Sequence, residues 1–111
     1  MNIIIRKRFD KGCPNWNTNP EFSEMFLRTQ QTYFNNVMQI QEFVFLRDVY
    51  MAIGLPVTKE SCMLGWAKGV VKDEDFVNIF EYSKIKGTDD FELVFECYPI
   101  LDYLETEDVV G

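Results

Sequence analysis

Carboxylates are the residues of this chain that could carry acid–base chemistry, because the sequence contains no histidine. Ser-His and Cys-His nucleophile systems, most zinc enzymes and the most frequent general base are therefore excluded. Two close carboxylate pairs remain, Asp73/Asp75 and Asp89/Asp90, and both fall in expected loops. Glycosidase chemistry needs two carboxyl groups that face each other across a cleft, and neither pair implies such a cleft.

Other signatures of chemistry are also missing from the sequence. Gly54, Gly65 and Gly69 form neither GxGxxG nor GxxxxGK, so no phosphate-binding loop is indicated. Asp73-x-Asp75 lacks the rest of a calcium loop. We therefore expect a protein without a cofactor or metal and without enzymatic activity. A site built from Asp, Lys and Tyr is the catalytic alternative that the residue types leave open.

The cysteines and the apolar segments indicate a cytoplasmic protein. Cys13, Cys62 and Cys97 are odd in number, far apart and without a CxxC pair, so we expect three reduced thiols and no structural zinc. No apolar run approaches the roughly 18 residues that span a membrane. Near the start, residues 3–5 are apolar and the basic residues follow, which is the reverse of a secretory signal.

Charge is distributed unevenly along the 111 residues, whose formal net charge is −7. Residues 1–60 contain seven Lys and Arg against six Asp and Glu, whereas residues 61–111 contain four against twelve, a net charge of −8. Such a surface is either a solvated face that keeps the domain soluble or a binding face for a basic partner. The candidate contact residues are the carboxylates of two clusters, Asp73, Glu74, Asp75, Asp89 and Asp90.

Residues 45–69, FLRDVYMAIGLPVTKESCMLGWAKG, superficially follow the pattern of a DNA-binding helix-turn-helix. That motif needs a small residue four positions before the turn glycine and an apolar one six positions after it. Relative to Gly54, these positions hold Tyr50 and Glu60. A recognition helix also presents basic or amide groups to DNA, and the candidate helix offers one lysine and little else. The stretch is therefore expected to be structural, with Trp66 in the core.

A basic segment at the start of the chain supports a second hypothesis, a nucleic-acid-binding regulator. Its cations are Arg6, Lys7, Arg8 and Lys11. Four charges beside Asp10 make a small patch, so a solvated strand end is the favoured interpretation and nucleic acid the less favoured partner.

Hydrophobic periodicity in the first half predicts two helices. A Thr-x-x-Glu capping box at residues 18–21, with Pro20 inside the first turn, starts an amphipathic helix of about five turns. A shorter helix is predicted from Leu46 to Ile53, where Gly54 and Pro56 end it. The apolar residues of the long helix recur at three-and-four spacing and are expected to be core: Phe22, Met25, Phe26, Tyr33, Phe34, Val37 and Met38.

The second half of the chain changes to the period of two that is typical of strands. Strands are predicted at residues 63–68, 75–84 and 91–97, and residues 86–90 would form a hairpin loop. The predicted fold is α+β, with N-terminal helices, one long and one short, packed on a C-terminal antiparallel sheet of about three strands. A single domain is expected, divided into a strand and loop (1–19), a helical part (20–56), mainly strands (57–100) and an acidic tail (101–111).

Four segments carry a resemblance to other proteins: FLRDVYMAIGLP, ESCMLGW, DFVNIFEY and FELVFE. Together with the preceding amphipathic helix, they resemble a set of short proteins carried by phages, plasmids and integrative elements of Gram-positive bacteria. The resemblance covers about residues 20–98. It implies a setting, a mobile genetic element in a bacterial cell, and transfers no activity and no functional residues.

The main functional hypothesis is a non-enzymatic phage or mobile-element protein that binds a host protein with a basic surface through its acidic face. An anti-defence inhibitor, acting on a CRISPR nuclease or a restriction system, is its concrete form. The alternatives are the nucleic-acid-binding regulator and a homo-oligomeric structural protein. The sequence leaves open whether the aromatic stripe of the long helix packs within one copy or against a second.

Overall fold

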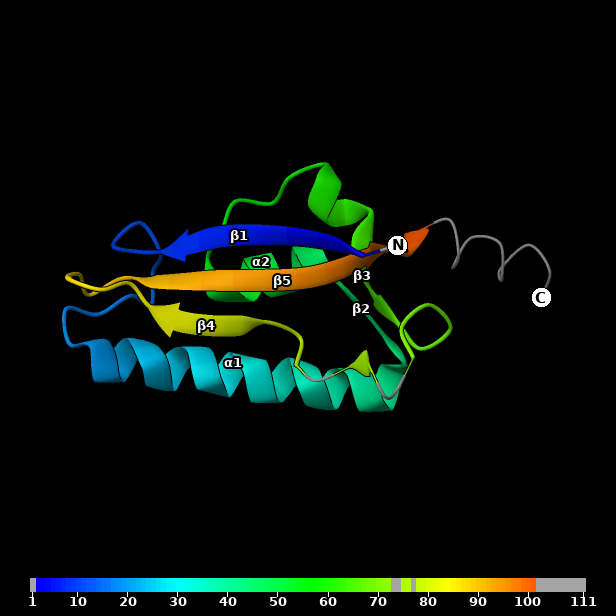
Figure 1. The fold of residues 1–111 in the computed structure, drawn as a ribbon, viewed down its shortest axis with the longest axis horizontal. Coiled ribbons are helices and arrows are strands. Elements are labelled where there is room, and N and C mark those ends of the chain that lie inside the picture. The colour runs from blue at the N-terminus through cyan, green and yellow to red at the C-terminus, as the bar shows by residue number, and fades with distance from the viewer. Residues whose placement is uncertain (1, 73–74, 77, 102–111) are drawn as a thin grey trace.

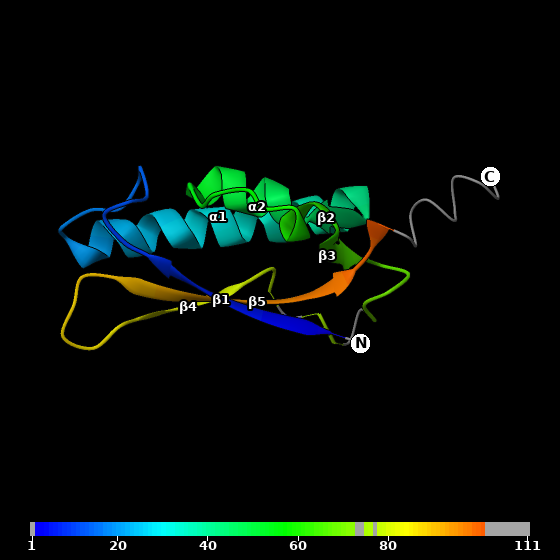
Figure 2. The same ribbon diagram turned by 90° about the horizontal axis from the view of Figure 1, so that it is seen from above.

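Two helices cover one face of a five-stranded antiparallel sheet (Figures 1 and 2). The computed structural model describes residues 2–72, 75–76 and 78–101. In chain order the elements are β1 (Ile3–Phe9), α1 (Pro20–Gln41), β2 (Phe43–Phe45), α2 (Leu46–Ile53), a 3-10 turn η1 (Glu60–Cys62), β3 (Leu64–Ala67), β4 (Glu81–Lys84) and β5 (Phe91–Pro99).

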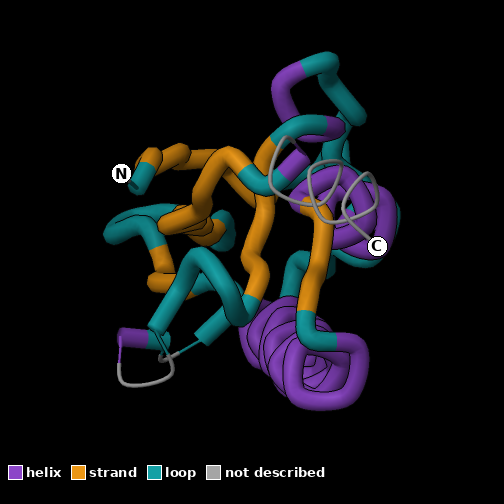
Figure 3. Tube along the Cα trace, turned by 90° about the vertical axis from the view of Figure 1, so that its right-hand side faces the viewer, coloured by secondary structure: helices purple, strands orange, loops and turns teal. Residues whose placement is uncertain are grey.

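Strand β5 is the centre of the sheet because it pairs with three other strands. β1 pairs with it from Ile3↔Cys97 to Phe9↔Phe91 along one edge. On the other edge β4 pairs with the beginning of β5, and β3 pairs with its last residues. β2 pairs with β3 and completes the sheet beside the C-terminal end of α1 (Figures 1 and 3).

The core lies between the helices and one face of the sheet. The alternation predicted for β5 is confirmed, since Phe91, Leu93, Phe95 and Cys97 are at most 2% exposed. Phe95 packs against the ring of Tyr50 from α2, with ring centroids 5.4 Å apart. The apolar side of α2 is buried as expected, and Gly54 ends this helix with a φ of 96°, the left-handed conformation that glycine adopts without strain.

The predicted arrangement of N-terminal helices on a three-stranded sheet is wrong. The sheet has five strands, and both helices lie between strands in chain order. β1 continues through the basic residues because Arg6 and Arg8 project from the exposed face of the sheet. The strand therefore forms without the free-energy cost of burying their charges. The three-residue β2 is too short to show a period. The α+β class itself is confirmed.

The expected core stripe of α1 is wrong for Phe22, Met25 and Tyr33, which are exposed. The buried apolar residues of α1 include Leu27 and Phe34, which lie on another side of the helix. The three-and-four spacing of the sequence therefore combines two different apolar faces of one helix.

Two predicted boundaries also move. The N-cap of α1 is Asn19 and not Thr18, because the Asn19 side chain accepts a hydrogen bond from the Glu21 amide at 3.0 Å. The predicted strand over residues 75–84 is formed only from Glu81 onward.

The three cysteines are free, and Cys13 and Cys97 are buried. Burial raises the pKa of the Cys97 thiol to about 12 and that of the Tyr50 phenol to about 12. In the described part of the chain, no helix has the length and apolar character that crossing a membrane requires.

Gly65 permits the close approach of β3 to β2, and we expect Gly65→Ala to destabilise the fold. A Cβ atom there would lie 2.1 Å from the Val44 carbonyl oxygen, which belongs to backbone and cannot move away. The expected loss is about 3 kcal/mol of unfolding free energy. Gly87→Ala is the comparison, with open space around it and a φ of 80°; it should cost about 1 kcal/mol. Denaturant unfolding measures both, and equal losses would contradict the steric argument.

Alkaline pH should destabilise the protein through Cys97 and Tyr50. Their ordinary pKa values are 9.0 and 10.0, and the folded state raises both to about 12. The folded state therefore favours the neutral forms, so the stabilisation is complete below pH 9 and is lost as the pH rises towards 12. Urea midpoints measured from pH 8 upward test this, and the decline should be shallower for Tyr50→Phe than for the wild type.

Candidate functional site

β3 and β4 pair with the same edge of β5 and leave a gap between them. Pairing with β4 ends at Val94 and pairing with β3 begins at Tyr98, so residues 95–97 have no strand neighbour on this edge. Trp66 fills part of the gap, since its Nε1 donates a hydrogen bond to the Glu96 carbonyl at 2.7 Å. This bond satisfies an acceptor that a neighbouring strand would otherwise satisfy.

A pocket of about 210 Å³ opens at this gap, and we call it the β5 notch. Its aromatic lining is Trp66, Phe76, Phe80 and Tyr98. Its carboxylates are Asp75, Glu81 and Glu96. Glu81 pairs with Val94 across the sheet, and Glu96 lies two residues further along β5, so both side chains share the face of the sheet opposite the core.

Among the described residues, Glu81 and Glu96 of the β5 notch have polar neighbours but no cation partner. Glu81 accepts a hydrogen bond from the Asn78 amide at 2.9 Å, and Glu96 accepts one from Asn2. None of the ion pairs among the described residues includes Asp75, Glu81 or Glu96.

The phenol of Tyr98 lies in the negative environment of the β5 notch. Its pKa is raised, first by burial and then by the negative charges of Glu96 and Asp75. The phenol therefore stays protonated beside the two carboxylates and keeps its O–H donor. A negative, partly apolar pocket of this kind is suited to a positively charged group.

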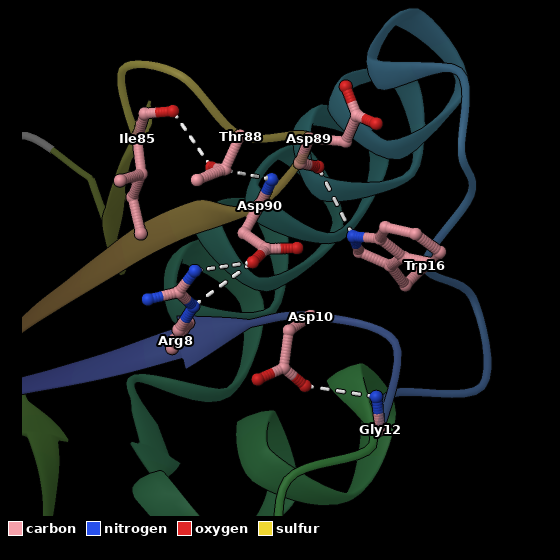
Figure 4. Close-up of polar contacts among 8 residues, drawn as sticks. All are labelled: Arg8, Asp10, Gly12, Trp16, Ile85, Thr88, Asp89 and Asp90. Atoms are coloured by element: carbon pink, nitrogen blue, oxygen red, sulfur yellow. Dashed lines mark hydrogen bonds and ion pairs between the residues drawn. The ribbon is translucent and has the colours of Figure 1, made fainter.

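The predicted carboxylates Asp89 and Asp90 lie in the β4–β5 hairpin (Figure 4). Asp90 accepts two hydrogen bonds from Arg8, at 2.6 and 3.1 Å, and its side chain is only 17% exposed. The Asp90 amide also donates to the Thr88 hydroxyl at 3.1 Å. Asp90 therefore fixes the hairpin to β1. Asp89 is exposed, and its carbonyl accepts a hydrogen bond from the Trp16 indole at 3.1 Å.

The structure does not bring the predicted carboxylates together. Asp73 and Glu74 lie outside the described residues. Asp75 lines the β5 notch, at the end of β4 opposite the hairpin that carries Asp89 and Asp90. Glu81 and Glu96 are far apart in sequence, and the register of β4 on β5 is what places them beside the same pocket.

The cations of the nucleic-acid hypothesis are largely engaged within the protein. Arg6 pairs with Glu92 at 3.0 Å and Arg8 with Asp90 at 2.6 Å. The Lys7 ammonium lies 5.8 Å from the centroid of the Tyr50 ring. These contacts reduce the positive potential that a phosphate backbone would meet. Within the described ranges, no group of three His, Cys, Asp or Glu residues is arranged to hold a metal ion.

The chain matches a protein-family model. Residues 5–104 match the family of unknown function DUF6353. The chain belongs to DUF6353. The match begins within β1 and extends beyond β5, so the DUF6353 domain includes the hairpin and the β5 notch. No curated protein and no solved structure matches the chain.

The two hairpin carboxylates should differ in their effect on stability. Asp90→Asn removes the charge that holds Arg8, and we expect a loss of about 1 kcal/mol of unfolding free energy. Asp89→Asn makes the same chemical change on an exposed side chain that forms no ion pair with a described residue, so it should leave stability unchanged. Thermal unfolding of the two variants at low and high salt tests the distinction. An equal loss of stability in the two variants would contradict a stabilising role for the Arg8–Asp90 ion pair.

Proposed function

We propose that this DUF6353 protein is a non-enzymatic protein of a phage or mobile genetic element that binds a basic surface of a host protein. The observation that carries the proposal is the β5 notch, where Asp75, Glu81 and Glu96 surround an aromatic pocket without a cation partner among the described residues. In the complex, an arginine or lysine side chain of the partner supplies the missing positive charge.

The size and lining of the notch favour a side chain over a free small molecule. Its volume of about 210 Å³ lies below the roughly 300–1,000 Å³ of typical ligand sites. The rings of Phe76 and Tyr98 are partly exposed in the notch, and aromatic faces of this kind attract a guanidinium or ammonium group. The carboxylates supply acceptors for its N–H donors. An arginine fits this combination best, because its planar group both stacks on rings and binds carboxylates.

The excess of carboxylates in the second half of the sequence supports the choice of a basic protein surface. Residues 61–111 have a net charge of −8, so approach to a cationic partner is favoured over a long range. A host surface rich in arginine and lysine is commonly one that contacts nucleic acid. Occupying such a surface blocks it, and this is the action of an anti-defence inhibitor directed at a CRISPR nuclease or a restriction enzyme. The mobile-element setting rests on the sequence resemblance.

A pair of charge-matched variants tests the role of the notch in binding. The notch variant carries Asp75→Asn, Glu81→Gln and Glu96→Gln. The control variant carries Asp89→Asn, Glu21→Gln and Glu60→Gln, which remove the same charge from exposed positions elsewhere. A blocked tri-arginine peptide is titrated into each protein by calorimetry, with the citrulline peptide as the uncharged analogue. We expect salt-sensitive binding of the arginine peptide to the wild type and the control, and at least tenfold weaker binding to the notch variant.

The same three proteins serve as bait in a nuclease-treated lysate of a Gram-positive host. The expected result is a host protein that the wild type and the control retain, that the notch variant loses, and that added nucleic acid displaces. Equal retention by the notch variant would contradict the location of the site. A host protein that is retained from untreated lysate but lost after nuclease treatment would contradict direct protein binding and would favour nucleic acid as the partner.

A further inference from the structure

Helix α1 has a second apolar side that faces away from the core. Among the described elements, none lies on this outer side of α1 (Figures 1 and 3). Its large apolar residues are 56–80% exposed. Spacings of three and four residues put the members of this side in one line along the helix. We call this line the α1 stripe: Phe22, Met25, Thr29, Tyr33, Asn36 and Ile40.

The α1 stripe lies on a helix that is nearly free of charge. Asp, Glu, Lys and Arg make up 26% of the chain, yet residues 29–41 contain none of them. Glu21, Glu24 and Arg28 are the charged residues of α1, and the last two form an ion pair at 3.1 Å. Exposed Phe, Tyr and Met combined with missing charges are the composition of an interface core and not of a solvated face.

We infer that two copies of this protein associate through their α1 stripes, with the helices antiparallel about a two-fold axis near the level of Gln31. The inference uses no residue of the β5 notch and does not depend on the proposed function. Phe22 and Ile40 each lie nine residues from Gln31, and Thr29 and Tyr33 each lie two residues from it. An antiparallel pair therefore places Phe22 of each copy opposite Ile40 of the other.

Electrostatics favours the antiparallel direction of the two helices. Each copy has a net charge of −7, so two copies repel one another, and this repulsion is weakest where the approaching faces are neutral. In the antiparallel arrangement the first turns of one α1, which carry Glu21 and Glu24, meet the uncharged residues 38–41 of the other, and Glu42 lies just beyond them at the C-cap. A parallel arrangement would place Glu21 and Glu24 beside the same residues of the second copy, which is unfavourable.

The exposed area is sufficient for a small, reversible dimer. An aromatic side chain presents about 150–250 Å², so Phe22 and Tyr33, at 56% and 58% exposure, each offer roughly 100 Å². Met25 and Ile40, at 58% and 80% exposure, are counted at roughly the same area. Two copies together contribute roughly 800 Å² from these residues, and the neighbouring amide side chains bring the total towards the roughly 1,200 Å² of the smallest specific interfaces. The helix of 22 residues is about 33 Å long, enough for the whole contact.

Analytical ultracentrifugation of the full chain over a range of concentrations tests the dimer. The stripe variant carries Tyr33→Glu and Ile40→Glu, and the control carries Val57→Glu and Met63→Glu, which also replace exposed apolar residues and add the same charge. The wild type and the control should change from monomer to dimer with rising concentration. The stripe variant should dissociate at least tenfold more readily. Circular dichroism verifies folding, and Phe22→Ser with Ile40→Ser replaces the stripe variant if that variant is unfolded.

Cross-linking with a short bismaleimide tests the direction of the helices. Phe22→Cys and Ile40→Cys are made separately in a Cys62→Ser background, because Cys62 is the partly exposed native cysteine. The antiparallel pair predicts a cross-link when the two variants are mixed, and none for either variant alone. A cross-link of the Phe22→Cys variant to itself would show a parallel pair and overturn the arrangement. A wild type that is monomeric at every concentration, or a control that dissociates as the stripe variant does, would overturn the dimer.

Discussion

The pairing of β5 with three strands is the constraint on which the rest of the structure depends. β5 has nine residues and pairs with β1 along one edge. Along its other edge it pairs first with β4 and then with β3. Alternation along the same strand gives Phe91, Leu93, Phe95 and Cys97 to the core and leaves the intervening side chains to the outer face. The burial of these four side chains, which contributes to the hydrophobic stabilisation of the sheet, thereby also decides which residues of β5 are available to a partner.

The β5 notch exists because β3 cannot follow β5 for long. β3 pairs with only two residues of β5 and then pairs with β2. Gly65 lies at the point where both pairings meet, and its missing side chain lets the Val44 carbonyl approach. The next residue, Trp66, then closes the sheet with its side chain in place of backbone. The short pairing of β3 with β5 and the Trp66 side chain therefore leave a pocket with an aromatic wall beside two outward-facing glutamates.

The two surfaces identified in the protein differ in their physics. The lining of the β5 notch comes from strands and from the segment before β4, with no residue from α1. It is acidic and attracts cations over a distance, so its binding is expected to weaken with salt. The α1 stripe is neutral and apolar, and its association should be insensitive to salt or strengthened by it. Because the two surfaces share no residue, a partner bound at one leaves the other free to bind.

The sequence by itself determined the features that depend on short-range physics. The alternation of β5, the apolar side of α2 and its end at Gly54 were all predicted, because a strand period, a helix period and a left-handed glycine are local. The acidic character of the second half and the absence of histidine were also available from composition alone.

Tertiary structure decided the rest. The pairing of β1 with β5 spans most of the chain, the notch depends on the register of β4, and the division of α1 into a buried and an exposed apolar side depends on what packs against it. The same carboxylate type became an ion-pair partner at Asp90 and a pocket lining at Asp75, because a side chain's role is set by neighbours that lie far away in sequence.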